Sequence, residues 1–254
     1  MLSVLIPEDR RRVTLRFSHP KGNIITAELV TQLRQAADDL SRSPETRLVV
    51  LEGEGNDFSF GASVPEHGAG EIERVLPDFH ALMLDWLHLP MPTAALVRGR
   101  CFGGGFELAL ACDFIFAADD ATFALPEIAL GVFPPAASVL LPKRVGMAAA
   151  TSAALTGAIK TAGEWKSLGL LELVAPADRL SATVDEWFSR TLGRWSAESL
   201  RHAVTALRTP LREAAAKELA EVERLYLHDL MRTHDASEGV AAFMEKRAPK
   251  WKDR

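Results

Sequence analysis

Residues 103–127 of this chain read GGGFELALACDFIFAADDATFALPE, and this stretch decides how the fold is interpreted. It begins with three glycines, Gly103 to Gly105, between an apolar segment and a run typical of a short helix. Inside a regular helix or strand each glycine would cost about 0.5–1 kcal/mol relative to alanine, so the run needs a reason. Two reasons fit. The turn could let a strand and a helix pack closely, or it could expose backbone N–H groups that stabilise negative charge on a carbonyl oxygen.

A phosphate site is a poor fit to the same turn. A dinucleotide-binding loop would need a further glycine where Phe106, Glu107 and Leu108 stand. No Lys-Ser or Lys-Thr pair follows, as a nucleotide-binding P-loop requires, and the Glu107 carboxylate would repel a phosphate. The sequence therefore favours a carbonyl compound over a nucleotide at this position.

Two acidic residues, Glu107 and Glu127, bracket the stretch. Taken alone, Glu107 could be a surface residue in the first turn of a helix, and Glu127 a solvated loop carboxylate. Taken together, two carboxylates that flank one substrate can divide acid and base work over a bound water. The sequence does not show whether they are close in space.

The overall composition excludes several classes of partner. The 254 residues include 48% hydrophobic and 25% charged residues, which is ordinary for a globular protein. The net charge of −5 provides no basic field, so nucleic acid is an unexpected partner. The seven histidines and two cysteines show no metal-ligand spacing, so we expect no metal and two buried free thiols.

Features of the chain that bear on its location point to the cytoplasm. No apolar run approaches the roughly 18 residues that span a bilayer, so no membrane partner is expected. The first twelve residues, MLSVLIPEDRRR, place the apolar run before the charges, which is the reverse of a secretory signal.

Hydrophobic periodicity predicts an α/β protein. Strands are expected at residues 13–17, 47–52, 93–97, 114–117 and 121–124, with a short one at 172–174. Helices are expected from Thr26 to Leu40 and at residues 70–88 and 106–112. Asp113 is expected to anchor a strand end. From Ser138 onward the chain is mostly helical, and the composition shifts near residue 195. We therefore divide the chain into residues 1–195, a core for binding and catalysis, and residues 196–254, a helical region.

Several strings in a fixed order carry a resemblance to a known family. They are residues 58–62 (FSFGA), 103–109 (GGGFELA), 112–114 (CDF), 125–128 (LPEI) with Gly131, and 238–247 (EGVAAFMEKR). This combination, which covers nearly the whole chain, resembles the crotonase family of enoyl-CoA hydratases and isomerases. The resemblance implies a stack of ββα units with a C-terminal helical trimerisation region, and a trimer or a dimer of trimers.

The resemblance also implies roles for particular residues. Backbone N–H groups of Ala62 and Gly104 would form an oxyanion hole for a thioester oxygen, and Glu107 and Glu127 would be catalytic, one activating water and the other exchanging a proton with carbon. Coenzyme A would be part of the substrate, with no separate cofactor. Its contacts would come from these residues: Ala62, Ser63, Val64, Pro65, Gly104, Phe243 and Lys246.

Some strings depart from the common hydratase pattern. The first loop has Gly61-Ala62-Ser63 where many hydratases have Gly-Ala-Asp, and residues 134–138 (PPAAS) replace a frequent Gly-Gly pair, which should stiffen that loop. These strings, together with residues 140–142 (LLP), are similar to the branch that hydrates cyclohexa-1,5-diene-1-carbonyl-CoA to 6-hydroxycyclohex-1-ene-1-carbonyl-CoA in anaerobic aromatic breakdown. A cyclic acyl group would suit a pocket lined by Phe60, Phe133 and residues 75–83.

Other activities of the same family stay open. A general enoyl-CoA hydratase is one, and an isomerase, hydrolase or decarboxylase is another, although these often lack one of the two acids. A non-catalytic acyl-CoA-binding relative is a different class. The presence of both Glu107 and Glu127 favours hydration.

Overall fold

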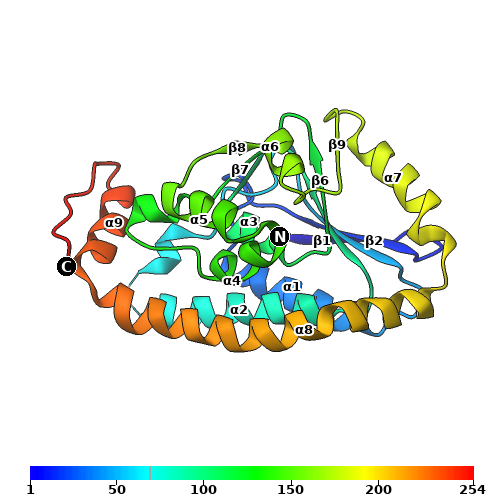
Figure 1. Cartoon of the computed structure of the whole chain (residues 1–254), viewed down its shortest axis with the longest axis horizontal. Coiled ribbons are helices and arrows are strands. Elements are labelled where there is room, and N and C mark those ends of the chain that lie inside the picture. The colour runs from blue at the N-terminus through cyan, green and yellow to red at the C-terminus, as the bar shows by residue number, and fades with distance from the viewer. Residues whose placement is uncertain (69) are drawn as a thin grey trace.

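A six-stranded sheet forms the centre of the protein, whose computed structural model describes residues 1–68 and 70–254 (Figure 1). The strand order is β1-β2-β3-β4-β6-β9, and β1 is antiparallel to β2 while all other neighbours are parallel. The strands are β1 (Leu2–Leu5), β2 (Arg12–Phe17), β3 (Leu48–Gly53), β4 (Thr93–Val97), β6 (Phe114–Ala118) and β9 (Leu173–Ala175). The predicted α/β class is confirmed.

A second, smaller sheet has the order β5-β7-β8. It consists of β5 (Arg100–Phe102), β7 (Thr122–Ala124) and β8 (Lys160–Thr161). The sequence prediction missed β1, β5 and β8. The last two have three residues or fewer, too short to show a period-two pattern, and β5 lies between Gly99 and Gly103.

Nine α-helices occur in the described ranges 1–68 and 70–254. They are α1 (Ala27–Ser41), α2 (Ile72–His88), α3 (Gly104–Leu110), α4 (Pro135–Val145), α5 (Met147–Thr156), α6 (Ala162–Ser167), α7 (Leu180–Arg190), α8 (Ala197–Arg224) and α9 (His234–Met244). The Thr26 side chain caps α1 by accepting a hydrogen bond from the Leu29 N–H, as its position predicts. Helix α3 begins at Gly104, two residues before the predicted start, because Gly104 and Gly105 are already helical.

The strands of the large sheet read as apolar because they are buried on both faces. All six residues of β3 and all five of β4 are buried, as expected for parallel strands covered on both sides. Helix α8 runs along one side of the molecule beside α2 (Figure 1) and contributes Ala215 and Leu219 to the main core.

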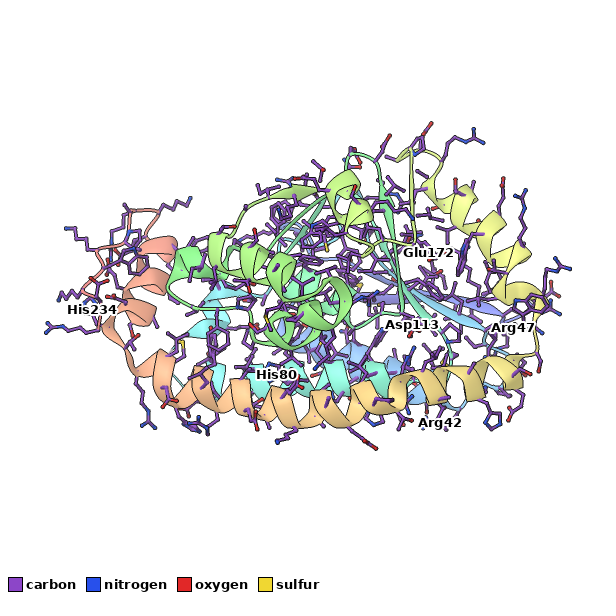
Figure 2. All side chains as sticks on the ribbon, viewed as in Figure 1. Arg42, Arg47, His80, Asp113, Glu172 and His234 are labelled. Carbon is purple, nitrogen blue, oxygen red and sulfur yellow. The ribbon has the colours of Figure 1, made fainter. Side chains whose placement is uncertain are left out.

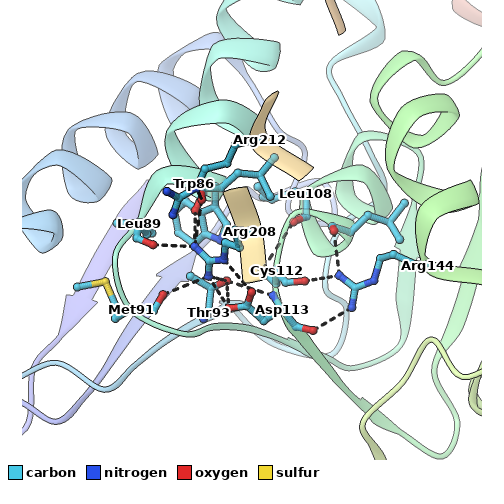
Figure 3. Close-up of polar contacts among 12 residues, drawn as sticks. Trp86, Leu89, Met91, Thr93, Leu108, Cys112, Asp113, Arg144, Arg208 and Arg212 are labelled. Atoms are coloured by element: carbon cyan, nitrogen blue, oxygen red, sulfur yellow. Dashed lines mark hydrogen bonds and ion pairs between the residues drawn. The ribbon is translucent and has the colours of Figure 1, made fainter. Parts of the chain in front are cut away.

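Arg208 attaches α8 to the central sheet (Figure 3). The Arg208 side chain is only 3% exposed and forms an ion pair with Asp113, with an Nε–Oδ1 distance of 2.8 Å. Its other nitrogens donate to the backbone oxygens of Leu89 (2.7 Å) and Met91 (3.1 Å) and to the Thr93 hydroxyl (3.2 Å). Asp113 also accepts from the Thr93 N–H at 2.8 Å. The expectation that Asp113 anchors a strand end is therefore confirmed, with a partner from α8 that sequence alone did not indicate.

Candidate active site

An enclosed cavity of about 260 Å³ lies beyond the carboxyl ends of the parallel strands. Three segments that follow successive strands meet there: the loop after β3, the glycine turn after β4 and β5, and the 3₁₀ turn η2 (Pro126–Leu130) after β6 and β7. Ligands commonly bind at this edge of a parallel sheet. Four of the predicted site residues, Ala62, Gly104, Glu107 and Glu127, line this one cavity.

The glycine turn lets neighbouring segments approach closely, which is one of the two purposes that the sequence left open. A Cβ atom on Gly105 would lie 2.6 Å from the Ser59 Cβ, so this position is glycine for close packing. Gly103 has a φ of +50°, and a Cβ there would lie 2.7 Å from Oε1 of Glu127. A Cβ atom on Gly104 would lie 3.2 Å from the Ala62 nitrogen, so the two loops touch at the cavity.

The N–H groups of Ala62 and Gly104 have no acceptor in the described part of the chain. Ala62 forms a parallel bridge with Ile25, in which the neighbouring Gly61 oxygen and Ser63 N–H make the hydrogen bonds, at 2.9 and 3.0 Å. The Ala62 N–H is therefore left free. Gly104 is the first residue of α3, where an N–H has no partner within the helix.

Glu107 is deeply buried and held by the start of α4. The residue is 4% exposed, and its Oε1 accepts a hydrogen bond of 2.9 Å from the Ala137 N–H. Burial raises the pKa of Glu107, while the Ala137 N–H, the charge of His80 and the Ala136 N–H act in the opposite direction. Residues 134–138, which depart from the common hydratase pattern, thus supply donors that favour the ionised form of Glu107.

Glu127 lies in a different environment. It is in the first turn of η2, and its Oε2 is buried without a hydrogen-bond partner among the described residues. Burial, with a smaller contribution from the negative charge of Glu107, raises the pKa of Glu127 to about 8. The Ala137 N–H thus favours the charge on Glu107, whereas the unpartnered Oε2 and the raised pKa favour the proton on Glu127.

His80 extends the site behind the cavity wall. This residue of α2, labelled in Figure 2, is 3% exposed, and its Nδ1 lies 2.8 Å from Oε2 of Glu223 on α8. Its Nε2 is buried with no partner in the described ranges. Sequence reasoning did not pair His80 with Glu223, because the two lie far apart in the chain and only the packing of α2 on α8 brings them together.

The remaining cavity wall is mostly apolar. The prediction that Phe60 and Phe133 line the pocket is confirmed, and Val75, Leu76 and Phe79 of α2 join them, although Met83 at the end of the predicted range is fully buried elsewhere in the core. Ile72, Leu130 and Tyr226 complete this side of the wall. Tyr226 was missed, although it is the one tyrosine of the sequence.

The predicted coenzyme A contacts divide into two groups. Val64 and Phe243 line the cavity together with Ala62, whereas Ser63, Pro65 and Lys246 do not. Lys246 comes two residues after α9 and has a φ of +55°. Ser63 and Pro65 are adjacent in sequence to lining residues, and Lys246 comes three residues after Phe243.

The described residues contain neither a candidate metal cluster nor a candidate membrane-spanning helix. No group of three or more His, Cys, Asp or Glu side chains among them could hold a metal ion. None of their helices combines the length and the apolar character needed to cross a membrane. Cys101 and Cys112 are buried free thiols, as predicted.

A sequence profile described as enoyl-CoA hydratase/isomerase matches residues 12–254. The chain belongs to this family. The crotonase-type enzyme is 42% identical to cyclohexa-1,5-dienecarbonyl-CoA hydratase of Thauera aromatica over 253 residues, covering 100% of this chain and 97% of the relative. It is 33% identical to a probable enoyl-CoA hydratase of Mycobacterium bovis, with 99% and 98% covered.

Solved structures agree with the fold of this crotonase-family enzyme. An enoyl-CoA hydratase from Mycobacterium avium subsp. paratuberculosis superposes with a TM-score of 0.87 at 28% identity, covering 99% of this chain and 98% of the other. The expected crotonase fold is therefore confirmed, including a C-terminal helical region formed by α8 and α9.

Proposed function

We propose that this crotonase-family enzyme adds water to a conjugated enoyl- or dienoyl-CoA thioester. The observation that carries the proposal is the asymmetric carboxylate pair. Glu107 is held by backbone N–H groups that favour its charge, and Glu127 has an unpartnered oxygen and a raised pKa, and both line one cavity. An acid and a base with separated environments suit the addition of water.

The oxyanion hole would be formed by the free N–H groups of Ala62 and Gly104. When a nucleophile adds to the β-carbon of an enoyl thioester, negative charge develops on the thioester oxygen. Two preorganised donors stabilise that charge more than they stabilise the substrate, and losing one such donor costs about 3–4 kcal/mol of barrier. The contact between the two loops supports this pairing of donors.

The protonation states assign the roles of the two acids. Glu107, as the ionised member, takes a proton from water while the water oxygen bonds to the β-carbon. Glu127, as the protonated member, then gives its proton to carbon and completes the addition. Because the charge moves from Glu107 to Glu127, the pair returns to its starting state by exchanging a proton with solvent.

For the substrate we propose cyclohexa-1,5-diene-1-carbonyl-CoA, with 6-hydroxycyclohex-1-ene-1-carbonyl-CoA as the product. The identity of 42% with a relative of that activity and the aromatic walls Phe60 and Phe133 support a cyclic acyl group. In this diene, water at the β-carbon C2 gives an enolate that extends over C6 and C5. Protonation at C5 leaves the double bond that the product has, so the two acids serve carbons on opposite sides of the ring.

Two other reactions are alternatives to hydration of the cyclic diene. A general enoyl-CoA hydratase is supported by the 33% identity to the Mycobacterium bovis protein. An isomerase would use the same pair to move a proton between two carbons without adding water. A non-catalytic acyl-CoA-binding relative would have no need for two buried carboxylates, whose burial is costly.

Coenzyme A would extend from the cavity along Ala62, Ser63, Val64 and Pro65. Phe243 and Lys246 would contact it as well, with the ammonium group facing a phosphate.

An assembly of three or six copies is also part of the proposal. Leu207, Phe243 and Met244 of the C-terminal helices are 80%, 53% and 52% exposed. Contiguous apolar patches mark contact surfaces, and we propose that Phe243 and Met244, adjacent in α9, contact a neighbouring copy.

The test is the loss of enoyl-thioester absorbance on incubation with the cyclic dienoyl-CoA and, separately, with crotonyl-CoA. We expect both to take up water, with the larger kcat/KM for the cyclic substrate. Glu107→Gln and Glu127→Gln should each reduce turnover at least about 100-fold, whereas the exposed Glu8→Gln should not change it. If neither thioester takes up water, the proposal is wrong, and a near-normal rate for either site variant removes that residue from the mechanism.

A further inference from the structure

Tyr226 is the single tyrosine of the chain, and it lines the cavity that also contains Glu107 and Glu127. It belongs to a π-helical turn, η4 (Leu225–Asp229), that follows directly after α8. π-helical turns are rare and frequently occur at functional sites. The Tyr226 ring is 2% exposed and packs edge-on against Phe133, with the ring centroids 5.4 Å apart. Its orientation is therefore fixed.

The position of Tyr226 follows from helical spacing. Glu223, three residues earlier, holds His80, so Glu223 and Tyr226 project from the same side of the helix toward α2. On α2, Leu76 and His80 are four residues apart and form the matching pair. The pair Leu76 and Tyr226 lines the cavity. The pair His80 and Glu223, one helical turn away, packs behind it.

The Tyr226 hydroxyl has no hydrogen-bond partner among the residues that the structure describes. The hydroxyl is not one of the fully buried polar atoms that lack a partner, and Tyr226 lines the cavity, so the hydroxyl can bond to the contents of the cavity. Burial raises the pKa of Tyr226, and the charges of Glu107 and Glu127 raise it further. The hydroxyl therefore keeps its proton at neutral pH and acts as a donor.

Tyr226 lines the same cavity as Glu107 and Glu127, and its ring is held there by Phe133. In the proposed reaction that cavity holds the oxygen that is added, since Glu107 must reach the water. The thioester oxygen is assigned to the N–H groups of Ala62 and Gly104. The other hydroxyl in the wall, that of Thr26, is engaged as the cap of α1. The added oxygen is thus the remaining acceptor in the cavity to which we assign Tyr226.

We propose that Tyr226 is a further substrate-binding residue, whose hydroxyl donates a hydrogen bond to the oxygen that is added: the bound water before the reaction and the hydroxyl group of the product after it. This inference rests on the proposed hydration. The water oxygen uses one lone pair for the new carbon–oxygen bond and the other to accept from Tyr226. One water proton goes to Glu107, Glu127 gives its own proton to carbon, and Tyr226 keeps its proton throughout.

The consequence is selectivity for a hydroxylated acyl group. The matched ligands are 6-hydroxycyclohex-1-ene-1-carbonyl-CoA and cyclohex-1-ene-1-carbonyl-CoA, which differ only in the hydroxyl. Their dissociation constants are measured by calorimetry in the Glu107→Gln background, where the thioester is not converted, with and without Tyr226→Phe. We expect Tyr226→Phe to weaken binding of the hydroxylated thioester about five- to tenfold and to change the other less than twofold.

A packing variant separates this role from a structural one. Phe133→Leu removes the ring contact with Tyr226 but no donor, and should weaken both ligands by a similar factor. If Tyr226→Phe weakens both ligands equally, or neither, or if the hydroxylated thioester does not bind at all, the proposal is overturned. Failure of the hydration itself would appear instead in the wild-type absorbance assay, which does not depend on these binding constants.

Discussion

Replacing Glu127 by glutamine should stabilise the protein at alkaline pH, although it removes a proposed catalytic group. The pKa of Glu127 is about 8 in the folded protein, against the ordinary value of 4.5. Below pH 4.5 both the folded and the unfolded chain hold the proton, so the raised pKa of Glu127 does not lower the free energy of unfolding. Between pH 4.5 and 8 only the folded state keeps it, and the free energy of unfolding falls by 1.36 kcal/mol per pH unit. The loss amounts to about 5 kcal/mol at most, and it stops above pH 8.

The assay is urea denaturation of wild type and Glu127→Gln at intervals from pH 5 to pH 9. Other groups titrate in both proteins, so the quantity of interest is the difference between their free energies of unfolding at each pH. We expect the variant to gain on the wild type steadily up to about pH 8 and then to keep a constant advantage. Parallel curves across the whole range would refute the reasoning, because they would show that folding does not perturb this carboxyl group.

Three further outcomes are expected. Arg208→Ala should lower the free energy of unfolding by about 3 kcal/mol in urea denaturation, because it leaves Asp113 without its buried partner. The control Arg42→Ala, at an exposed ion pair, should lower it by less than about 1 kcal/mol. Equal losses would contradict the attachment of α8 to the sheet through Arg208. Gly103→Ala and Gly55→Ala both place alanine at positive φ, and each should lower the free energy of unfolding by about 1 kcal/mol. Only Gly103→Ala, whose Cβ meets the Glu127 carboxylate, should reduce kcat more than about tenfold. Unchanged turnover of Gly103→Ala would show that the turn does not position Glu127. Finally, kcat should decline as the pH rises through about 8, since Glu127 then loses the proton that it donates, and a rate that stays constant to pH 9.5 would exclude it as the acid.

Much of the fold could be predicted from the sequence because its long elements carry strong patterns. The buried strands β3 and β4 and the amphipathic helices α1 and α2 have enough residues to show their periods. The short strands could not be predicted in this way. β5 and β8 exist because their backbones pair with β7, which is a property of the folded chain and not of their own residues.

The site shows the same division between local and long-range information. The glycine turn and the two glutamates occur within one short stretch, and their motif was sufficient to predict residues that line one cavity. His80, Glu223 and Tyr226 come from two helices whose packing brings them to the cavity. None of them occurs in a local motif, and a buried histidine or tyrosine in a helix is usually a core residue. Their interactions became visible only once the packing of α2 against α8 was known.

Addition of water is the proposed reaction, and isotopic labelling of the product tests it most directly. The cyclic dienoyl-CoA is converted in deuterated, oxygen-18-enriched water, and the thioester product is analysed by mass spectrometry and NMR. We expect one oxygen-18 on the carbon β to the thioester and one deuterium on the ring carbon opposite that one. Neither label should appear with the Glu107→Gln variant. A product that carries deuterium but no oxygen-18 would show an isomerase, and oxygen-18 in a free carboxylic acid would show a hydrolase; either result would contradict the account.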